Sequence, residues 1–230
     1  MTDLVLLHAF PLDARMWDVP GALTPSLRGQ GEPGLDALAS QVLAVLDERG
    51  LDKVLLGGCS MGGYVAMALL RQAPERVRGL VFVDTKHTAD TPEAAANRHA
   101  MADRVEREGV GEWLVEAMVP NLLGPNASGT ARALVRTMIL EQRPEDVAWW
   151  QRAMAGRPDS TDVLESLDVP SLVLVGEHDK LTPPDVAAKL AVTLRRSTSE
   201  RIEDCGHLPP VERPDEFRAR LERWRAQVGL

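Results

Sequence analysis

Short apolar runs that do not alternate with polar residues recur along the chain, and turn residues follow each of them. The clearest four are rich in valine and leucine and lie at 4–7, 54–58, 80–83 and 172–176. This pattern is typical of strands that are buried on both faces, as in a parallel sheet covered by helices. Weaker runs at 22–24 and 199–206 are candidates for further strands, which gives a predicted sheet of about six.

Helical periodicity fills the segments between these runs. Apolar residues at helical spacing predict one helix over 35–48, and the nearly uniform apolar stretch 63–72 predicts a buried helix that stops before Pro74. A helix with Thr182 as its N-cap and Pro183 at its first position should follow, and Pro214 should begin the last helix. Strands that alternate with helices predict an α/β fold with a doubly wound, mostly parallel sheet.

The segment 88–158 breaks this alternation, since it contains several helical stretches and no strand-like run. Because it is inserted between two predicted strands, we expect it to form a helical cap over the carboxyl edge of the sheet. The predicted division is a core made of residues 1–87 and 159–230, with a cap made of residues 88–158.

Composition and charge exclude several classes of protein. The formal net charge of −8, without a cluster of Lys and Arg, argues against nucleic acid or an anionic membrane as a partner. Cys59 and Cys205 are too few for a disulfide framework and lack metal-ligand spacing. No apolar run approaches the roughly 20 residues of a membrane span. We therefore expect a soluble, reduced, cytoplasmic protein without a metal site.

Four glycines surround Ser60 in the stretch LLGGCSMGGYVAMALL. The five residues 58–62 match G-x-S-x-G, and a predicted strand precedes them while a predicted helix follows. In such a nucleophile elbow the serine lies on a sharp strand-to-helix turn, and the glycines let strand and helix approach closely. The context predicts that the Ser60 hydroxyl lies at the carboxyl edge of the sheet.

A nucleophilic serine needs a base, and the base needs an acid that orients it. In the elbow architecture the acid and then the histidine follow the serine along the chain. Asp179 follows the predicted strand at 172–176, and His207 follows the next strand-like stretch. Asp84, at the end of another predicted strand, is the alternative acid, for which we otherwise expect a supporting role in binding loop amides.

An oxyanion hole requires two hydrogen-bond donors beside the serine. One is expected to be the backbone N–H of Met61, which follows Ser60 at the start of a predicted helix. The loop after the first predicted strand supplies the second candidate, the backbone N–H of Phe10.

Five motifs in this order resemble the α/β-hydrolase superfamily over nearly the whole chain: HAFPLDARMW, LRGQG, GCSMGGYVAMALL, VGEHDKLTPP and CGHLPP. They look like a branch that contains 3-oxoadipate enol-lactonases, cofactor-free haloperoxidases and related esterases. The resemblance implies an α/β-hydrolase fold that needs no cofactor. It also implies a triad of Ser60, Asp179 and His207, with Phe10 and Met61 as oxyanion donors.

The chain departs from the family pattern near its N-terminus. Its first predicted strand corresponds to the third strand of the family, so the usual N-terminal hairpin is expected to be absent. Ser26 stands where relatives carry an aspartate near Arg28, and we therefore expect any buried ion pair there to be lost. The shortened region before it is expected to leave the strand at 22–24 stunted.

These features favour a serine hydrolase that cleaves a small carboxylic ester or lactone through an acyl-enzyme. A catalytically weak receptor for a small ligand and an acyltransferase or perhydrolase remain the alternatives, and Pro11 is a residue type associated with perhydrolysis in this branch. In the cap, Trp113, Met118 and Trp149 are candidates for an apolar substrate pocket. They are equally suited to packing the cap helices together.

Overall fold

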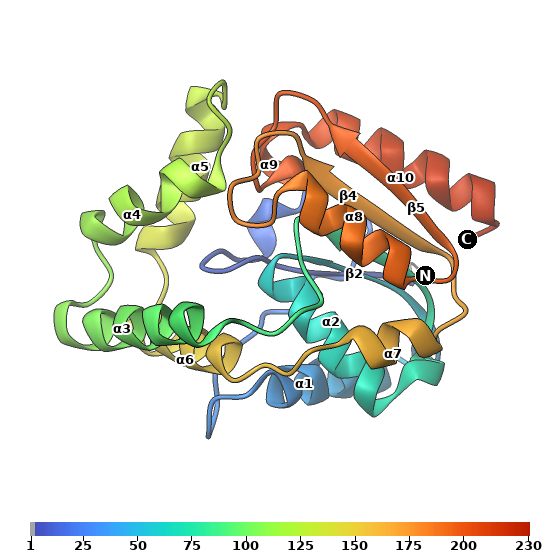
Figure 1. The fold of residues 1–230 in the computed structure, drawn as a ribbon, viewed down its shortest axis with the longest axis horizontal. Coiled ribbons are helices and arrows are strands. Elements are labelled where there is room, and N and C mark those ends of the chain that lie inside the picture. The colour runs from blue at the N-terminus through green and yellow to red at the C-terminus, as the bar shows by residue number, and fades with distance from the viewer. Residues whose placement is uncertain (1–2) are drawn as a thin grey trace.

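The computed structural model describes residues 3–230, which form one five-stranded parallel sheet (Figure 1). Its strands lie in chain order and are β1 (Leu4–Leu7), β2 (Val54–Cys59), β3 (Val77–Val83), β4 (Ser171–Gly176) and β5 (Ser197–Ile202). The segment 22–24 contributes a single parallel bridge, between Val5 and Leu23, rather than a sixth strand. The parallel sheet is thus confirmed, with the stunted strand at the place where the chain is short.

Burial explains why some strands were easier to predict than others. Every residue of β1, β2 and β4 is buried, which matches their unbroken apolar sequences. In β5, which lies at the edge of the sheet, only Ile202 is buried. The predicted strand at 199–206 therefore had a weak signal, and its last four residues form the loop that leads to His207.

Helices cover both faces of the sheet. In Figure 1, α1 (Leu35–Glu48), α2 (Met61–Gln72) and α7 (Thr161–Ser166) lie on one side of it, and α10 (Pro214–Val228) lies on the other. Helix α8 (Pro184–Thr193) packs on β4 and β5, and the short α9 (Pro209–Glu212) precedes α10. Two 3-10 turns, at Ala14–Met16 and Pro74–Arg76, complete this part of the chain. The residue that caps α8 is Pro183, so the prediction that Thr182 is its N-cap was wrong.

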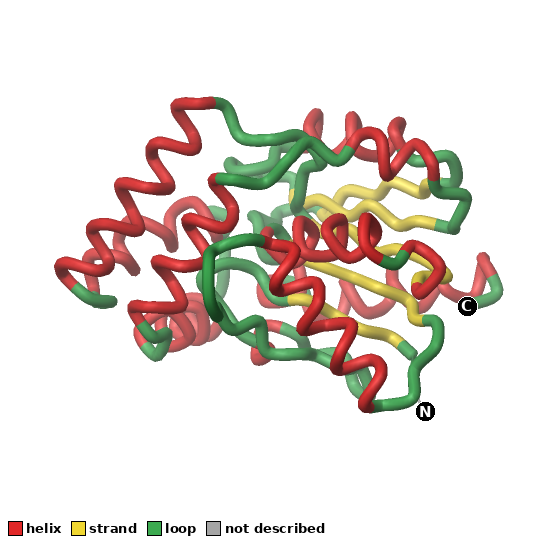
Figure 2. The backbone as a smooth tube through the Cα atoms, turned by 90° about the horizontal axis from the view of Figure 1, so that it is seen from below, coloured by secondary structure: helices red, strands yellow, loops and turns green. Residues whose placement is uncertain are grey.

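Four helices follow β3 in the segment expected to form the cap: α3 (Pro92–Glu108), α4 (Glu112–Leu122), α5 (Gly129–Leu140) and α6 (Pro144–Ala155). Figure 2 shows that these helices gather beyond one end of the strands. That end carries Ser60 and is the carboxyl edge of the parallel sheet. The boundaries at 88 and 158 remain a prediction.

Arg28 has an acidic partner, although Ser26 replaces the expected aspartate. Asp146 of α6, which is 2% exposed, accepts a hydrogen bond from Arg28 Nη1 at 2.7 Å and another from the Gly29 amide at 3.1 Å. Arg28, whose side chain is 48% exposed, is thus paired by a carboxylate other than the one expected at position 26. Helix α6 supplies the carboxylate from 118 residues farther along the chain, and this contact ties the helix to the loop before α1.

The turn between β2 and α2 brings three backbone segments into contact. A Cβ atom at Gly58 would lie 2.2 Å from the carbonyl carbon of Gly62, and one at Gly62 would lie 2.1 Å from the carbonyl oxygen of Leu7 in β1. Real Cβ atoms do not approach backbone so closely, so these two positions accept only glycine. The close approach predicted for the glycines around Ser60 is confirmed.

We expect Gly62→Ala to lower the free energy of unfolding by about 3 kcal/mol or more, because β1 and α2 must move apart to admit the methyl group. Gly129→Ala is the matched control, since Gly129 also lies in the first turn of a helix but has no atom within 4 Å of an added Cβ. It should leave stability unchanged or raise it slightly. Urea denaturation of both variants measures the difference, and equal stabilities would contradict the steric argument.

Candidate active site

Ser60 lies on a strained backbone between β2 and α2. Its φ of 50° and ψ of −112° are rare for a residue with a side chain. The strand β3 and the loop after it hold this conformation: the Ser60 amide donates to the Val83 carbonyl at 3.0 Å, and the Thr85 hydroxyl donates to the Ser60 carbonyl at 2.8 Å. The turn leaves Ser60 partly exposed, on the wall of a cavity.

Asp179 and His207 meet at the same edge of the sheet, although 28 residues separate them. Asp179 follows β4 and His207 follows β5. Asp179 Oδ2 lies 2.8 Å from His207 Nδ1, and both side chains are at most 1% exposed. The other ring nitrogen of His207, Nε2, is buried and has no hydrogen-bond partner among residues 3–230. His207 lines the same cavity as Ser60, so its unpartnered nitrogen is available to a hydroxyl there.

Three further donors hold the Asp179 carboxylate. Oδ1 accepts hydrogen bonds from the amides of Leu181 at 2.8 Å and Thr182 at 3.1 Å, and Oδ2 accepts one from the Thr182 hydroxyl at 2.6 Å. The side chain of Thr182 thus orients the acid instead of capping α8. Its position three residues after an aspartate is a sequence signal for such a turn, which the helix-cap interpretation missed.

These contacts keep Asp179 ionised. Burial alone would raise the pKa of its carboxyl group. The charge and hydrogen bond of His207 and the hydrogen bond from Thr182 outweigh burial and lower the pKa below its usual range. Asp179 is therefore a carboxylate that can stabilise a positively charged imidazole beside it.

Asp84 follows β3 in a left-handed conformation, with φ of 43°, and is fully buried. Its Oδ1 accepts a hydrogen bond from the Gly176 amide at 2.9 Å, which confirms the predicted contact with a loop amide. Burial, and next the negative charge of Asp179, raise the pKa of Asp84 well above its usual range. The other carboxyl oxygen of Asp84, Oδ2, is buried and has no hydrogen-bond partner among residues 3–230.

Oxygen and nitrogen atoms of Asp84, Asp179 and His207 lie within 4.8 Å of one another, so these residues could in principle ligate a metal ion. A cation would require Asp179 and His207 to give up the 2.8 Å contact that they make with each other. The hydrogen bonds described above account for the cluster without a cation.

A third buried acid at this site, Glu212, positions the loop that carries His207. Its carboxylate accepts hydrogen bonds from the amides of Gly206 at 2.9 Å and Gly124 at 2.8 Å. The His207 amide in turn donates to the Leu122 carbonyl at the end of α4, at 3.1 Å. The histidine loop is thereby joined to the segment after α4. No motif in the sequence identified Glu212, because its partners are backbone amides, one of them 88 residues away along the chain.

Of the two residues whose amides are expected to form an oxyanion hole, Phe10 lines the cavity and Met61 follows Ser60, which lines it. Met61 is the first residue of α2, where helix geometry leaves backbone N–H groups without helical partners. Phe10 lines the cavity, and its amide donates to no other group within the described residues 3–230. Their role as oxyanion donors remains a prediction.

The cavity beside Ser60 has a volume of about 270 Å³. Its apolar wall consists of Phe10, Met101, Met118, Met154 and Leu181. Met118 is therefore placed as predicted. Lys86 and Arg98 bring positive charge to the cavity, and no carboxylate from the described part of the chain lines it.

The cap tryptophans do not line this cavity, so the pocket prediction for Trp113 and Trp149 is corrected. Trp113 Nε1 donates to the Gly109 carbonyl, and the Arg104 guanidinium lies 3.9 Å from the ring centroid. Trp149 Nε1 donates to the Gly31 carbonyl at 3.0 Å. Their wide apolar rings are used to pack the cap helices on each other and on the loop before α1, which was the alternative interpretation.

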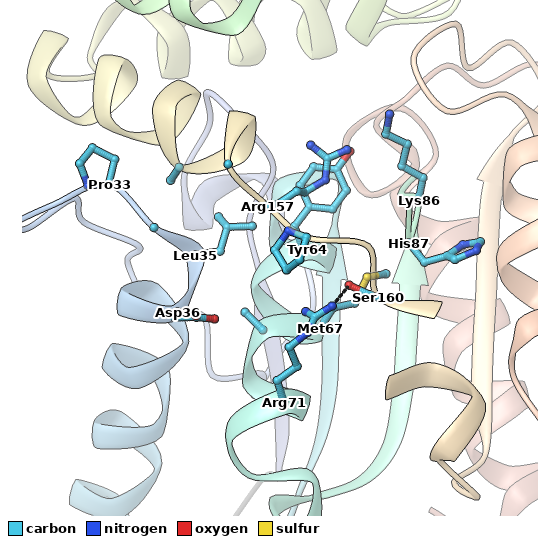
Figure 3. A pocket seen from close by; sticks show the side chains of 15 residues that line it. Pro33, Leu35, Asp36, Tyr64, Met67, Arg71, Lys86, His87, Arg157 and Ser160 are labelled. Carbon is cyan, nitrogen blue, oxygen red and sulfur yellow. Dashed lines mark hydrogen bonds between the residues drawn. The ribbon is translucent and has the colours of Figure 1, made fainter. Parts of the chain in front are cut away.

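A smaller cavity of about 100 Å³ adjoins the first (Figure 3). Tyr64 and Lys86 line both cavities, and the Arg157 guanidinium lies 4.1 Å from the centroid of the Tyr64 ring. On its far side Arg71 donates to the Ser160 hydroxyl at 2.9 Å. Neither Ser60 nor His207 lines this smaller cavity, so the reactive groups belong to the larger one.

Curated relatives of this chain are esterases. The chain is 31% identical over 241 residues to a pimeloyl-[acyl-carrier protein] methyl ester esterase of Pectobacterium carotovorum, covering 94% of this chain and 91% of the relative. A second protein of that name, from Aromatoleum aromaticum, is 27% identical and covers 96% of each chain. None of the helices within residues 3–230 combines the length and apolar character of a membrane span.

Solved structures show the same fold. A thermophilic esterase from Thermogutta terrifontis, solved with malate bound, superposes with a TM-score of 0.95 at 38% identity, covering 99% of this chain and 90% of its own. An enol-lactonase from Burkholderia xenovorans superposes with a TM-score of 0.86 at 21% identity, covering 98% and 92%. The model of the alpha/beta hydrolase family matches residues 4–220. The chain belongs to the alpha/beta hydrolase family.

Proposed function

We propose that this protein is a serine hydrolase that cleaves a small carboxylic ester through an acyl-enzyme on Ser60. The observation that carries the proposal is the 2.8 Å contact between Asp179 and His207, which leaves the other nitrogen of His207 unpartnered beside the cavity of Ser60. The esterase relatives support the same class of reaction. The reaction needs no cofactor.

In the first half of the reaction, the Ser60 oxygen attacks the ester carbonyl. His207 Nε2 takes the serine proton as general base, while the bond to Asp179 fixes the tautomer and stabilises the imidazolium. The carbonyl oxygen becomes an oxyanion, to which the amides of Phe10 and Met61 donate. When the intermediate collapses, the bond to the alkoxy oxygen breaks, and His207 gives its proton to the leaving alcohol.

In the second half, water replaces the alcohol. His207 removes a proton from the water, whose oxygen attacks the acyl carbon, and the carboxylic acid leaves as Ser60 regains its proton. A lactone would follow the same steps with its alcohol still tethered, and an acyltransferase or perhydrolase would place another acceptor where the water attacks. A receptor on this fold would bind the ligand without turnover.

A fluorophosphonate probe should label Ser60 and no other residue, because only an activated serine attacks phosphorus rapidly. The labelled peptide can be identified by mass spectrometry, with Ser60→Ala as the control. Turnover of p-nitrophenyl acetate far above that control would separate an enzyme from a receptor. Undiminished labelling of the Ser60→Ala protein would falsify the assignment of the nucleophile.

Asp179→Asn should lower kcat by about 10⁴, since an amide favours the wrong histidine tautomer and cannot stabilise the imidazolium. Asp84→Asn should lower kcat less than about tenfold, which is roughly 1.4 kcal/mol of barrier, because its side chain contacts Gly176 rather than His207. Ester hydrolysis by both variants, with circular dichroism as the check on folding, gives the ranking. A larger loss of kcat in Asp84→Asn than in Asp179→Asn would show that Asp84 is the acid that orients His207.

Asp84→Asn should also change how stability depends on pH. In the folded protein the pKa of Asp84 is raised above its ordinary 3.8, so folding takes up a proton there, and the wild-type protein loses stability as pH rises from about 4 toward the raised pKa. Asparagine does not ionise, so the variant should gain free energy of unfolding relative to wild type between pH 4 and pH 8. Urea denaturation at both pH values measures this gain, and a constant difference would show that Asp84 is ionised in the folded protein.

A further inference from the structure

Three cations gather around one buried carboxylate beside the active-site cavity. Asp90, whose side chain is 1% exposed, lies 3.1 Å from Lys86 Nζ, 2.5 Å from Arg98 Nε and 2.7 Å from Arg157 Nη1. Burial opposes ionisation of Asp90, but the hydrogen bond from Arg157 and the charge of Arg98 outweigh it and lower the pKa of this carboxyl. One negative charge thus faces three positive charges, and two positive charges are left without a partner in this cluster.

The three cations are not equivalent. Arg157 is 4% exposed, and its terminal nitrogens are used by Asp90 and by the carbonyls of Thr88 and Met154. Figure 3 shows its guanidinium against the ring of Tyr64. Arg157 therefore stabilises the cluster from its buried side, and Lys86 and Arg98 carry the excess positive charge.

Lys86 and Arg98 both line the cavity that contains Ser60 and His207. Arg98 Nη1 contacts the Gln151 side chain at 3.2 Å, whereas its Nη2 donates to no group within residues 3–230. No described acidic side chain lines the cavity. A cationic wall of a partly enclosed cavity is costly without counter-charge, and a ligand anion can supply that charge with hydrogen bonds from guanidinium and ammonium groups.

Much of the rest of the cavity lining is apolar and adaptable. Met101, Met118 and Met154 contribute unbranched side chains that pack against ligands of varied shape. A short methylene chain would fit such a lining, with a reactive ester at one end and an anion at the other.

We propose that Lys86 and Arg98 form an anion subsite of the active site, and that the preferred substrates are esters carrying a carboxylate away from the reacting bond, such as half-esters of small dicarboxylic acids. The inference rests on the proposed ester hydrolysis. The ester breaks between acyl carbon and alkoxy oxygen as before, and the distal carboxylate undergoes no chemistry.

The test compares monomethyl esters of succinic, glutaric and adipic acid with the matched methyl esters in which a carboxamide replaces the carboxylate. A second pair, the acetyl esters of glycolic acid and of glycolamide, places the charge on the alcohol side. The quantity measured is the ratio of kcat/KM for the charged ester to that for its neutral isostere. In the wild type this ratio should exceed about ten for at least one pair, as expected for a hydrogen bond to a charged group.

Lys86→Gln and Arg98→Gln should each lower this ratio about tenfold, and 0.5 M sodium chloride should lower it in the wild type. The ratio is taken within one variant, so a smaller fraction of folded enzyme does not change it. Arg107→Gln is the matched control, because Arg107 also lies on α3 but is 65% exposed and pairs with Glu108 outside the cavity. It should leave the ratio unchanged.

Binding of the same pairs to the Ser60→Ala protein, measured by calorimetry, separates this proposal from ester hydrolysis itself. Preferential binding of monomethyl glutarate that disappears on adding Arg98→Gln supports the subsite even if no ester is turned over. Ratios near one for every pair, in both hydrolysis and binding, overturn the subsite even if neutral esters are hydrolysed. Ratios that stay high in both Lys86→Gln and Arg98→Gln overturn the assignment to these residues.

Discussion

The contact of α2 with β1 at the turn around Ser60 is the constraint on which the site depends. The carbonyl of Leu7 lies where a side chain on Gly62 would be, so the helix can begin at Met61 only because no Cβ intervenes. The same closeness forces Ser60 into a strained conformation, which bonds from β3 and its following loop stabilise. Packing and chemistry are joined here, since the geometry that buries α2 also presents the serine to the cavity.

Around this turn, the ionisation of buried acids depends on burial, charge and hydrogen bonds. The charge and hydrogen bond of His207 and the hydrogen bond from Thr182 outweigh burial and lower the pKa of Asp179. Burial and next the negative charge of Asp179 raise the pKa of Asp84. Glu212 holds the histidine loop by accepting hydrogen bonds from two backbone amides. These arrangements fix the orientation of His207 before any substrate arrives.

The cap contributes both closure and charge to the cavity. Helix α6 is tied to the loop before α1 by Asp146, and α3 packs along α6. Those two helices carry Arg98 and Met154, so part of the cavity wall comes from the helices between β3 and β4, whereas Lys86 comes from the loop after β3. The inserted helices thus help to set the shape and charge of the cavity.

Local sequence patterns predicted what depends on neighbours in the chain. The apolar runs located the buried strands, periodicity located α1 and the cap helices, and motif order brought Ser60, Asp179 and His207 together. Patterns failed mainly where the partner lies far away: Arg28 pairs with Asp146 on α6, and the cap tryptophans pack rather than line the cavity. For Thr182 two local interpretations competed, and its side chain binds Asp179, three residues earlier, rather than capping its own helix.

The positively charged cavity wall formed by Lys86 and Arg98 is another feature that local sequence patterns did not predict. Lys86, Asp90, Arg98 and Arg157 are separate charges along the chain and show no motif. Only the packing of α3 and α6 against the loop after β3 brings Lys86, Arg98 and Arg157 to the carboxylate of Asp90. The same packing places two of these cations, Lys86 and Arg98, in the lining of the cavity that contains Ser60. The sequence by itself predicted the fold and the residues that we propose for the reaction, because local periodicity and turn geometry depend on consecutive residues. Tertiary structure decided the shape and charge of the cavity, because those depend on which distant side chains share a buried space.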